Sequence, residues 1–301
     1  MHTIPAYPEF APISLEMARE ISPFLVKLPD GVSEYCFAGL YLFRERYDYR
    51  VSIRDCFLVV SGRRDGKRFF LTPCCSTGMD TIDELFREHD YWKLISPAFV
   101  EQNRAAIEAA GYAIESDRDN FDYLYLRSEL ATLSGKKFHK KKNHVNAFEL
   151  SYPDHSLKAL DRTTRADALA VLEYWVSLEE RPEDTDYRAA KEALELMEQF
   201  EMTGLVLYVD GVPVAWTLAE MVAGGRIAAV HFEKARTDYR GAYQYINYAF
   251  AQYLPESVEF VNREQDLGDE GMRQAKMTYR PVGFVEKYRV GKKGYAPGSE
   301  R

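Results

Sequence analysis

Two tight turns join three β-strand patterns in the second half of the chain, and this arrangement limits the folds that the sequence can adopt. The dipeptide Asp210-Gly211 separates the apolar runs 204–209 and 212–222, and Gly224-Gly225 separates the second run from 226–232. Asp-Gly between alternating apolar runs is the strongest short signal for a β-hairpin. The sequence therefore predicts a three-stranded antiparallel meander.

The elements around the meander complete a recognisable order. Apolar spacing at three and four residues predicts two helices before it, over 164–181 and 187–202, and a third from about 242 to Pro255. A strand over 258–261, a helix over 270–279 that Pro281 ends, and a strand over 284–290 follow. This order resembles that of the GCN5-related N-acetyltransferase fold, although a fold alone does not determine function.

The first half repeats the pattern more weakly. A strand over 56–61, the dipeptide Asp65-Gly66 and a strand over 67–72 precede helices over 80–89 and 97–110 and strands over 112–115 and 121–126. This internal repeat predicts two tandem α/β domains, each with a mixed, mostly antiparallel sheet flanked by helices. Pro153 lies in a polar stretch that interrupts the pattern, so we expect the domains to span 1–150 and 151–301.

Composition excludes several classes of protein. The net charge of −8 argues against a general polyanion binder, so nucleic acid or phospholipid would need a local basic patch. The absence of a long apolar run and of a basic start predicts a cytoplasmic protein without an integral membrane segment. The four cysteines, Cys36, Cys56, Cys74 and Cys75, lack Cys-x-x-Cys spacing, so we expect reduced structural thiols and no metal site.

A run of lysines over 136–142 provides such a basic patch. At 100° per residue, Lys137, Lys140 and Lys141 share one face of a helix, for which Ser134 is a plausible N-cap. Two adjacent turns of lysine would bind a phosphate-rich ligand such as tRNA or a lipid headgroup. The alternative is an ordinary solvated helix face in an acidic protein.

The turn between the meander and the next helix is a second candidate site. Arg240, Gly241 and Ala242 would place backbone N–H groups and a glycine at a helix N-terminus, where a donor pyrophosphate could bind. The match to the usual acetyltransferase pattern is partial, because Asp238 opens the motif. Tyr243 closes it, and its bulk argues against ordinary coenzyme A binding. In the alternative interpretation, Gly241 only makes the turn.

Polar residues gather where the strand over 258–261 ends, a position at which α/β proteins place ligands. They would bind the acceptor or neutralise its charge, although exposure to solvent also explains their polarity. The predicted acceptor-binding residues are Asn262, Arg263, Glu264, Asp266 and Lys276.

The end of the third meander strand carries two candidate bases. Alternation along a strand predicts that His231 and Glu233 face the same side, where either could remove a proton from an attacking amine. Glu233 is the better candidate, because a lone strand histidine is more often structural. Tyr279, late in the last helix, is a candidate general acid.

Three segments carry a family resemblance: KKFHKKKNHVNAF, HFEKARTDYRGAYQYIN and NREQDLGDEGMRQAKMTYRPVGF. From about Tyr35 to Val290, the chain resembles a bacterial family related to the C-terminal domain of phosphatidylglycerol lysyltransferase. The resemblance implies two tandem acyltransferase-type domains. It also implies a relation to enzymes, among them the Fem transferases, that move an aminoacyl group from tRNA to an amine or hydroxyl.

The residues and the resemblance together predict an acyltransferase. It would transfer an aminoacyl or acyl group from aminoacyl-tRNA or acetyl-coenzyme A to a small-molecule or carrier-bound acceptor. Two alternatives remain at this point. One is an acetyl-coenzyme A-dependent N-acetyltransferase of a small molecule, and the other is a non-catalytic protein that binds tRNA or a lipid headgroup.

Overall fold

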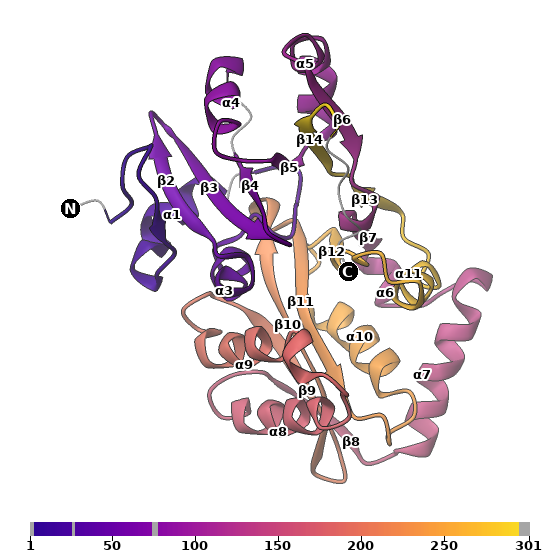
Figure 1. The fold of residues 1–301 in the computed structure, drawn as a ribbon. Helices are drawn as coiled ribbons and strands as arrows, with labels where there is room; N and C mark the ends of the chain where they lie inside the picture. Colours follow the sequence, from indigo (N-terminus) through magenta and orange to yellow (C-terminus); the bar gives the residue numbers. More distant parts are fainter. Residues whose placement is uncertain (1–2, 26–27, 74–77, 295–301) are drawn as a thin grey trace. The chain divides into compact units, whose positions relative to one another are not determined.

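The computed structural model describes residues 3–25, 28–73 and 78–294, which build two seven-stranded sheets (Figure 1). Of the four cysteines, Cys36 is buried and Cys56 is exposed, and among the described residues neither forms a disulfide, as expected for reduced thiols. Cys74 and Cys75 lie outside the described residues.

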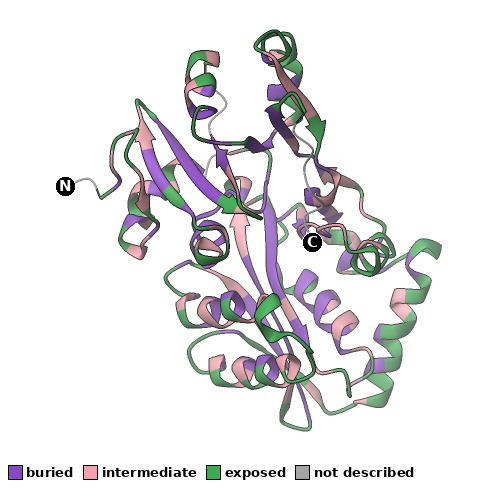
Figure 2. Cartoon of the chain, viewed as in Figure 1, coloured by how far each residue is buried: buried purple, intermediate pink, exposed green. Residues whose placement is uncertain are grey.

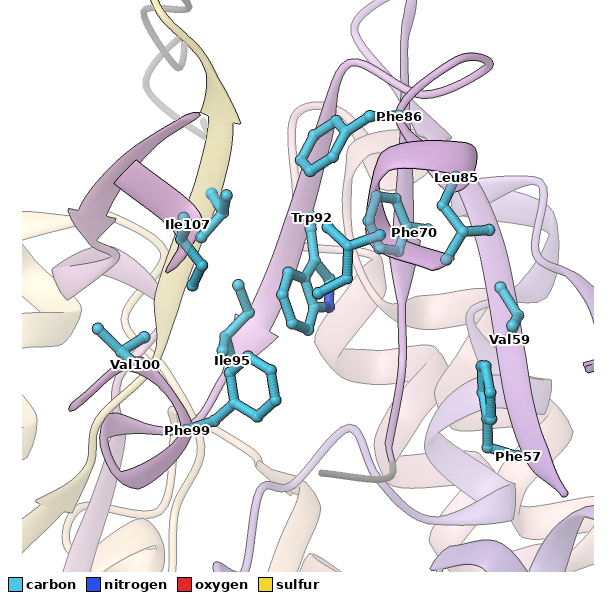
Figure 3. Close-up of a cluster of buried hydrophobic side chains, with 12 residues drawn as sticks. Phe57, Val59, Phe70, Leu85, Phe86, Trp92, Ile95, Phe99, Val100 and Ile107 are labelled. Atoms are coloured by element: carbon cyan, nitrogen blue, oxygen red, sulfur yellow. The ribbon is translucent and has the colours of Figure 1, made fainter. Parts of the chain in front are cut away.

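The first sheet has the strand order β1-β2-β3-β4-β5-β14-β6. Its strands are β1 (Ala11–Pro12), β2 (Arg50–Arg54), β3 (Phe57–Arg64), β4 (Lys67–Leu71), β5 (Tyr91–Ile95), β6 (Tyr112–Ser116) and β14 (Tyr288–Lys292). The helices of this part of the chain are α1 (Ala18–Leu25), α2 (Phe37–Leu42), α3 (Arg44–Tyr47), α4 (Met79–Leu85) and α5 (Pro97–Ala109). Its buried side chains include a cluster around Phe70, Trp92 and Phe99 (Figure 3).

The second sheet has the order β8-β9-β10-β11-β12-β7-β13. Its strands are β7 (Asp122–Leu126), β8 (His155–Ala159), β9 (Thr203–Val209), β10 (Val212–Val222), β11 (Ile227–Ala235), β12 (Phe260–Asn262) and β13 (Gly283–Val285). The helices between these strands are α6 (Arg127–Leu130), α7 (His139–Ser151), α8 (Arg165–Val176), α9 (Tyr187–Leu196), α10 (Ala242–Tyr253) and α11 (Glu270–Met277). Strands β10 and β11 are buried along most of their length (Figure 2), and α8 and α10 both pack against β10.

The predicted meander is confirmed. Strand β10 has the expected bounds and pairs antiparallel with both β9 and β11. Asp210 and Gly211 have φ values of 49° and 77°, which a two-residue turn of the mirror-image type requires. The local turn chemistry therefore specified this part of the fold.

The halves of the chain exchange one strand each, which the sequence did not predict. Strand β7, from the first half, lies between β12 and β13, and β14, near the C-terminus, lies between β5 and β6. The compact units consequently comprise the described residues within 1–123, 264–274 and 284–301, and those within 124–263 and 275–283. These units differ from the expected division at 150/151. The strand predicted over 284–290 is two strands, β13 and β14, in different sheets.

Each sheet contains a parallel pair of strands, β4 with β5 in the first sheet and β11 with β12 in the second. In the second sheet, β11 pairs with β12 only from Ile227↔Phe260 to Ala229↔Asn262. Strand β12 ends there, whereas β11 continues to Ala235. The side chains beyond Ala229 and Asn262 therefore lie where the two strands no longer pair, a position that favours a ligand site in α/β sheets.

Candidate active site

A buried ion pair lies beyond the paired part of β11 and β12. Arg263, which directly follows β12, donates through Nη2 to Glu233 Oε1 at 2.8 Å, and Asn247 of α10 donates through Nδ2 to the other carboxylate oxygen at 3.4 Å. The side chains of Arg263 and Glu233 are only 17% and 9% exposed. Removing either partner would leave an uncompensated buried charge. The structure thus brings together two residues that the sequence singled out separately.

Lys141 and Tyr279 extend this cluster. The Lys141 ammonium lies 3.9 Å from the centre of the Tyr279 ring, and the Arg263 guanidinium lies 5.1 Å from the same centre. Burial lowers the pKa of Lys141 to about 8, and the positive charge of Arg263 acts in the same direction. Burial also raises the pKa of Tyr279 to about 12. Near neutral pH the cluster therefore offers an amine that loses its proton readily and a phenol that keeps its own.

Two buried oxygens beside Glu233 have no hydrogen-bond partner among the described residues. They are Oδ1 of Asn247 and Oγ1 of Thr217, the residue that faces Glu233 across β10 and β11. Buried polar atoms are almost always hydrogen-bonded, so an unpartnered pair beside a buried charge marks a place for a ligand or water. Sequence reasoning missed both residues. The available signal was Asn247, a polar residue on the apolar face of a predicted helix.

Lys276 contributes through the backbone. Its Nζ donates to the Arg263 carbonyl at 2.6 Å, and the Tyr125 hydroxyl donates to the Lys276 carbonyl at 2.9 Å. The Lys276 ammonium thus holds the backbone of Arg263 in place. Its expected role in acceptor binding stays a prediction.

The expected common orientation of His231 and Glu233 is not found. The register of β10 and β11 shifts so that Leu218 faces Phe232 and Ala219 faces Val230, which leaves His231 as the extra residue of a β-bulge. The His231 Nε2 atom lies 3.5 Å from Glu220 Oε2, in a different cluster from Glu233. A bulge breaks the two-residue alternation on which the expectation depended.

The lysine run does not form the predicted three-lysine face. A short 3₁₀ turn over Lys136–Phe138 precedes α7, so Ser134 does not cap the helix. Lys137 binds both carboxylate oxygens of Glu129, and Lys141 is half-buried in the cluster just described. Lys136 and Lys140 remain exposed, and within the described ranges neither has an ion-pair partner.

The glycine turn is packed against the lysine helix. Gly241 has φ of 92° and caps α10, and a Cβ added there would lie 3.2 Å from the His144 carbonyl oxygen and 3.3 Å from Phe148 Cβ, both on α7. Asp238 is held by the Arg236 guanidinium, and Arg240 is exposed. Atoms of α7 thus lie against the position that a side chain at residue 241 would occupy. Phosphate binding at Arg240, Gly241 and Ala242 stays a prediction.

We therefore expect Gly241→Ala to lower the free energy of unfolding by more than the 1–2 kcal/mol, roughly, that an L-residue pays in a left-handed conformation. Gly211→Ala is the matched control, because Gly211 also has positive φ but nothing within 4 Å of an added Cβ. Thermal or urea unfolding of both variants measures the difference. Equal losses of stability in the two variants would show that the packing of α7 at position 241 does not require a glycine.

The remaining acceptor-binding candidates are Asn262, Glu264 and Asp266. Asn262 is fully buried within β12, and Glu264 and Asp266 belong to the other compact unit. There, the Asp266 carboxylate accepts from Tyr123, Arg118 and Arg273 side chains and from the Gly268 backbone N–H.

These contacts define a structural role for Asp266. Burial would raise the pKa of its carboxyl, but the hydrogen bonds from Arg273, Tyr123 and Gly268 outweigh burial and lower it to about 2. With both oxygens occupied, Asp266 cannot receive an acceptor without losing these partners. The expectation that it binds the acceptor stays a prediction.

The two mixed sheets and their flanking helices confirm the predicted tandem acetyltransferase-like fold. The chain belongs to the family described as phosphatidylglycerol lysyltransferase, C-terminal, whose model matches residues 26–291. No helix among the residues the structure describes is long and apolar enough to cross a membrane.

Three solved structures are similar to this chain. A conserved protein of unknown function from Bacteroides thetaiotaomicron is 32% identical over 94% of this chain and 99% of its own, with a TM-score of 0.85. The L-PGS structure from Bacillus licheniformis is 15% identical over 85% of this chain and 92% of its own, with a TM-score of 0.59. FemX is 9% identical over 93% and 96%, with a TM-score of 0.60. The last two likenesses concern the fold alone.

One curated relative also matches. An uncharacterized protein from Mycoplasmoides gallisepticum is 25% identical over 178 residues, which are 56% of this chain and 55% of that protein. The chain thus spans about half the length of this relative.

Proposed function

We propose that the protein is an aminoacyltransferase that moves an aminoacyl group from tRNA to an amine or hydroxyl acceptor, and that the reaction takes place at Glu233, Arg263, Lys141 and Tyr279. The observation that carries the proposal is the buried Glu233–Arg263 pair at the open end of β11 and β12, with a half-buried amine beside it. The family's description supplies the reaction class.

Each residue of the cluster has its own role in the reaction. The acceptor's oxygen or nitrogen attacks the ester carbonyl carbon of the donor, and neutral Lys141 Nζ takes the proton that the acceptor loses. Protonated Tyr279 donates a hydrogen bond to the carbonyl oxygen as it gains negative charge. The ester C–O bond then breaks, and protonated Lys141 returns its proton to the oxygen that leaves as the tRNA hydroxyl.

Glu233 receives a positioning role in this scheme. Its two carboxylate oxygens already accept hydrogen bonds from Arg263 and Asn247, which makes it less available as the base than the sequence suggested. It would hold Arg263 beside the ring of Tyr279. The pH dependence of the transfer rate distinguishes Glu233 from Lys141 as the group that takes the proton.

Helix α7 supports tRNA as the donor. The exposed Lys140 lies in its first turn beside Lys141, which enters the cluster, and the exposed Lys136 lies in the 3₁₀ turn just before it. The packing of α7 on Gly241 weighs against coenzyme A, because a pyrophosphate would need the close approach that α7 already uses. A thermal-shift titration with acetyl-coenzyme A, coenzyme A and bulk tRNA tests the donor class. At about 100 times its Kd a ligand adds about 2.7 kcal/mol of stability.

The two exposed lysines give this proposal a quantitative test. Replacing Lys136 and Lys140 with Ala should weaken tRNA binding and reduce the slope of log K against log salt by about 1.5, because each lost phosphate contact removes about 0.7–0.9. Lys292 and Lys293, also exposed, make a matched pair with the same charge change. Filter binding at salt concentrations from about 50 to 200 mM measures the slope. Equal slopes for the two double variants would remove α7 from the tRNA site.

A further inference from the structure

The second sheet ends in a regular edge strand. Strand β8 has β9 on one side, and no strand that the structure describes pairs with its other side (Figure 1). It pairs with β9 without a register shift over all five of its residues, and four of the five are exposed. Many proteins interrupt such edges with a proline or a bulge, because a regular edge offers free N–H and C=O groups to another strand. Strand β8 has neither, so its edge is open to pairing.

The outward hydrogen-bonding groups of β8 belong to alternate residues. The Asp210 N–H donates to the Asp154 carbonyl at 3.1 Å, and the Leu160 N–H donates to the Gly204 carbonyl at 2.9 Å. The backbone on both flanks of β8 therefore faces β9, and in an antiparallel ladder every second residue does the same. The N–H and C=O groups of the three odd-numbered residues of β8, with Leu157 at their centre, consequently point away from the sheet.

This pattern of outward groups is self-complementary. In a second copy of β8 that lies antiparallel with Leu157 opposite Leu157, the two leucines exchange both backbone hydrogen bonds, and residue 155 of each strand exchanges them with residue 159 of the other. The Ala159 carbonyl already accepts from the Thr164 hydroxyl at 2.8 Å, but a carbonyl oxygen has a second lone pair. The Leu157 side chain is 39% exposed, and in this register it lies against its symmetry mate. A two-fold axis at Leu157 therefore pairs the edge and covers an exposed apolar side chain.

The exposed charges of this edge fit the same register. Asp154 and Lys158 lie four residues apart along the ladder, so their side chains share one face of the strand. Within the described residues neither has an ion-pair partner, and the Lys158 ammonium lies 4.6 Å from the centre of the Tyr208 ring. With Leu157 opposite Leu157, Lys158 faces Ser156 of the second copy and lies diagonal to its Asp154, a separation that a long side chain spans. Each dimer thus gains two ion pairs.

We propose that the chain forms a symmetric dimer in which two copies of β8 pair antiparallel around Leu157 and join their second sheets into one. A second copy of this chain is the partner that fits, because the outward backbone groups, the exposed leucine and the opposite charges all follow the order that a two-fold axis requires. The interface is small, so we expect a dimer that dissociates in the micromolar range. No residue of β8 belongs to the Glu233 cluster, so the dimer and the proposed transfer are tested separately.

Sedimentation velocity at protein concentrations from roughly 1 to 100 μM measures the association. The wild-type protein should pass from monomer to dimer over this range. A protein that remains a monomer throughout would overturn the proposal.

Charge exchange identifies the surface through which the copies pair. Lys158→Glu should raise the dimer Kd about 10-fold, because two exposed ion pairs become two like-charge contacts in each dimer. Asp154→Lys should have the same effect, and the double variant, which restores opposite charges in the same register, should return the Kd to near the wild-type value. Both positions are exposed, so the monomer should stay folded. A Kd that neither single change affects, or one that the double variant does not restore, would show that the copies do not pair through β8.

Leu157→Pro gives a second measurement that does not depend on charge. Proline has no N–H, and the N–H of Leu157 points away from β9, so an edge strand tolerates the change while the dimer loses its two central hydrogen bonds. The variant should remain a monomer at roughly 100 μM and keep the far-UV circular dichroism of the wild type. Dimerisation of the folded variant at the wild-type Kd would contradict the pairing of β8 around Leu157.

Discussion

Glu233→Gln is expected to slow aminoacyl transfer by about 10²-fold while the protein stays folded at the assay temperature. The amide can still accept a hydrogen bond from Arg263, so the local geometry is retained, but the buried guanidinium loses its counter-charge. Single-turnover rates measure the effect. Glu259→Gln is the control, since Glu259 pairs with Arg226 at 2.7 Å on an exposed surface and should leave the rate unchanged.

The pH dependence of the same rate assigns the proton acceptor. The lowered pKa of Lys141 predicts a rate that rises with pH through about 8, because only the neutral amine takes a proton. Glu233→Gln should keep this rise at a lower rate, and Lys141→Met should abolish it. A rise that survives in Lys141→Met but is lost in Glu233→Gln would return the base to Glu233.

Asp266→Asn is expected to cost about 3–5 kcal/mol of stability, the usual effect of breaking a fully buried charge pair. Its side chain is completely buried, and two arginines and a tyrosine depend on its charge. Asp119→Asn is the graded control. Asp119 shares Arg273 as a partner at 2.7 Å but is 38% exposed, so its loss should cost about 1 kcal/mol.

Acid unfolding tests the same carboxylate. Its pKa in the folded protein is lowered to about 2, so its contribution is complete above the ordinary carboxyl range and is lost as the pH falls from about 4 towards 2. Asp266→Asn should flatten the loss of stability over this interval, as measured by urea unfolding at a series of pH values. A wild-type slope in the variant would show that the charge of Asp266 does not stabilise the fold.

Local signals predicted the elements of this chain well. The hairpin at Asp210-Gly211, the bounds of β10 and the start of α10 at Ala242 depend on turn residues and periodicities within a few positions. The strand exchange depends on which distant strand β7 and β14 pair with, and no neighbouring residue specifies that. The predicted boundary at 150/151 therefore follows the repeat in the sequence rather than the compact units.

The sequence identified several residues of the candidate site, but not the full set that the structure brings together. Polarity at strand ends identified Glu233 and Arg263, because that position depends on the local pattern. The inward turn of Lys141 was missed, since the 3₁₀ turn before α7 changes the helical phase that the lysine spacing assumed. The contact of Asp266 with Arg118 could not be predicted, because Arg118 is 148 positions away in the chain.

Transfer of labelled lysine from lysyl-tRNA tests the central proposal most directly, with phosphatidylglycerol vesicles and a soluble amine as parallel acceptors. Label should move from tRNA to one acceptor with the wild-type protein and move about 10²-fold more slowly with Glu233→Gln. The proposal would be contradicted if the two proteins transferred label equally, or if acetyl-coenzyme A served as donor where lysyl-tRNA did not.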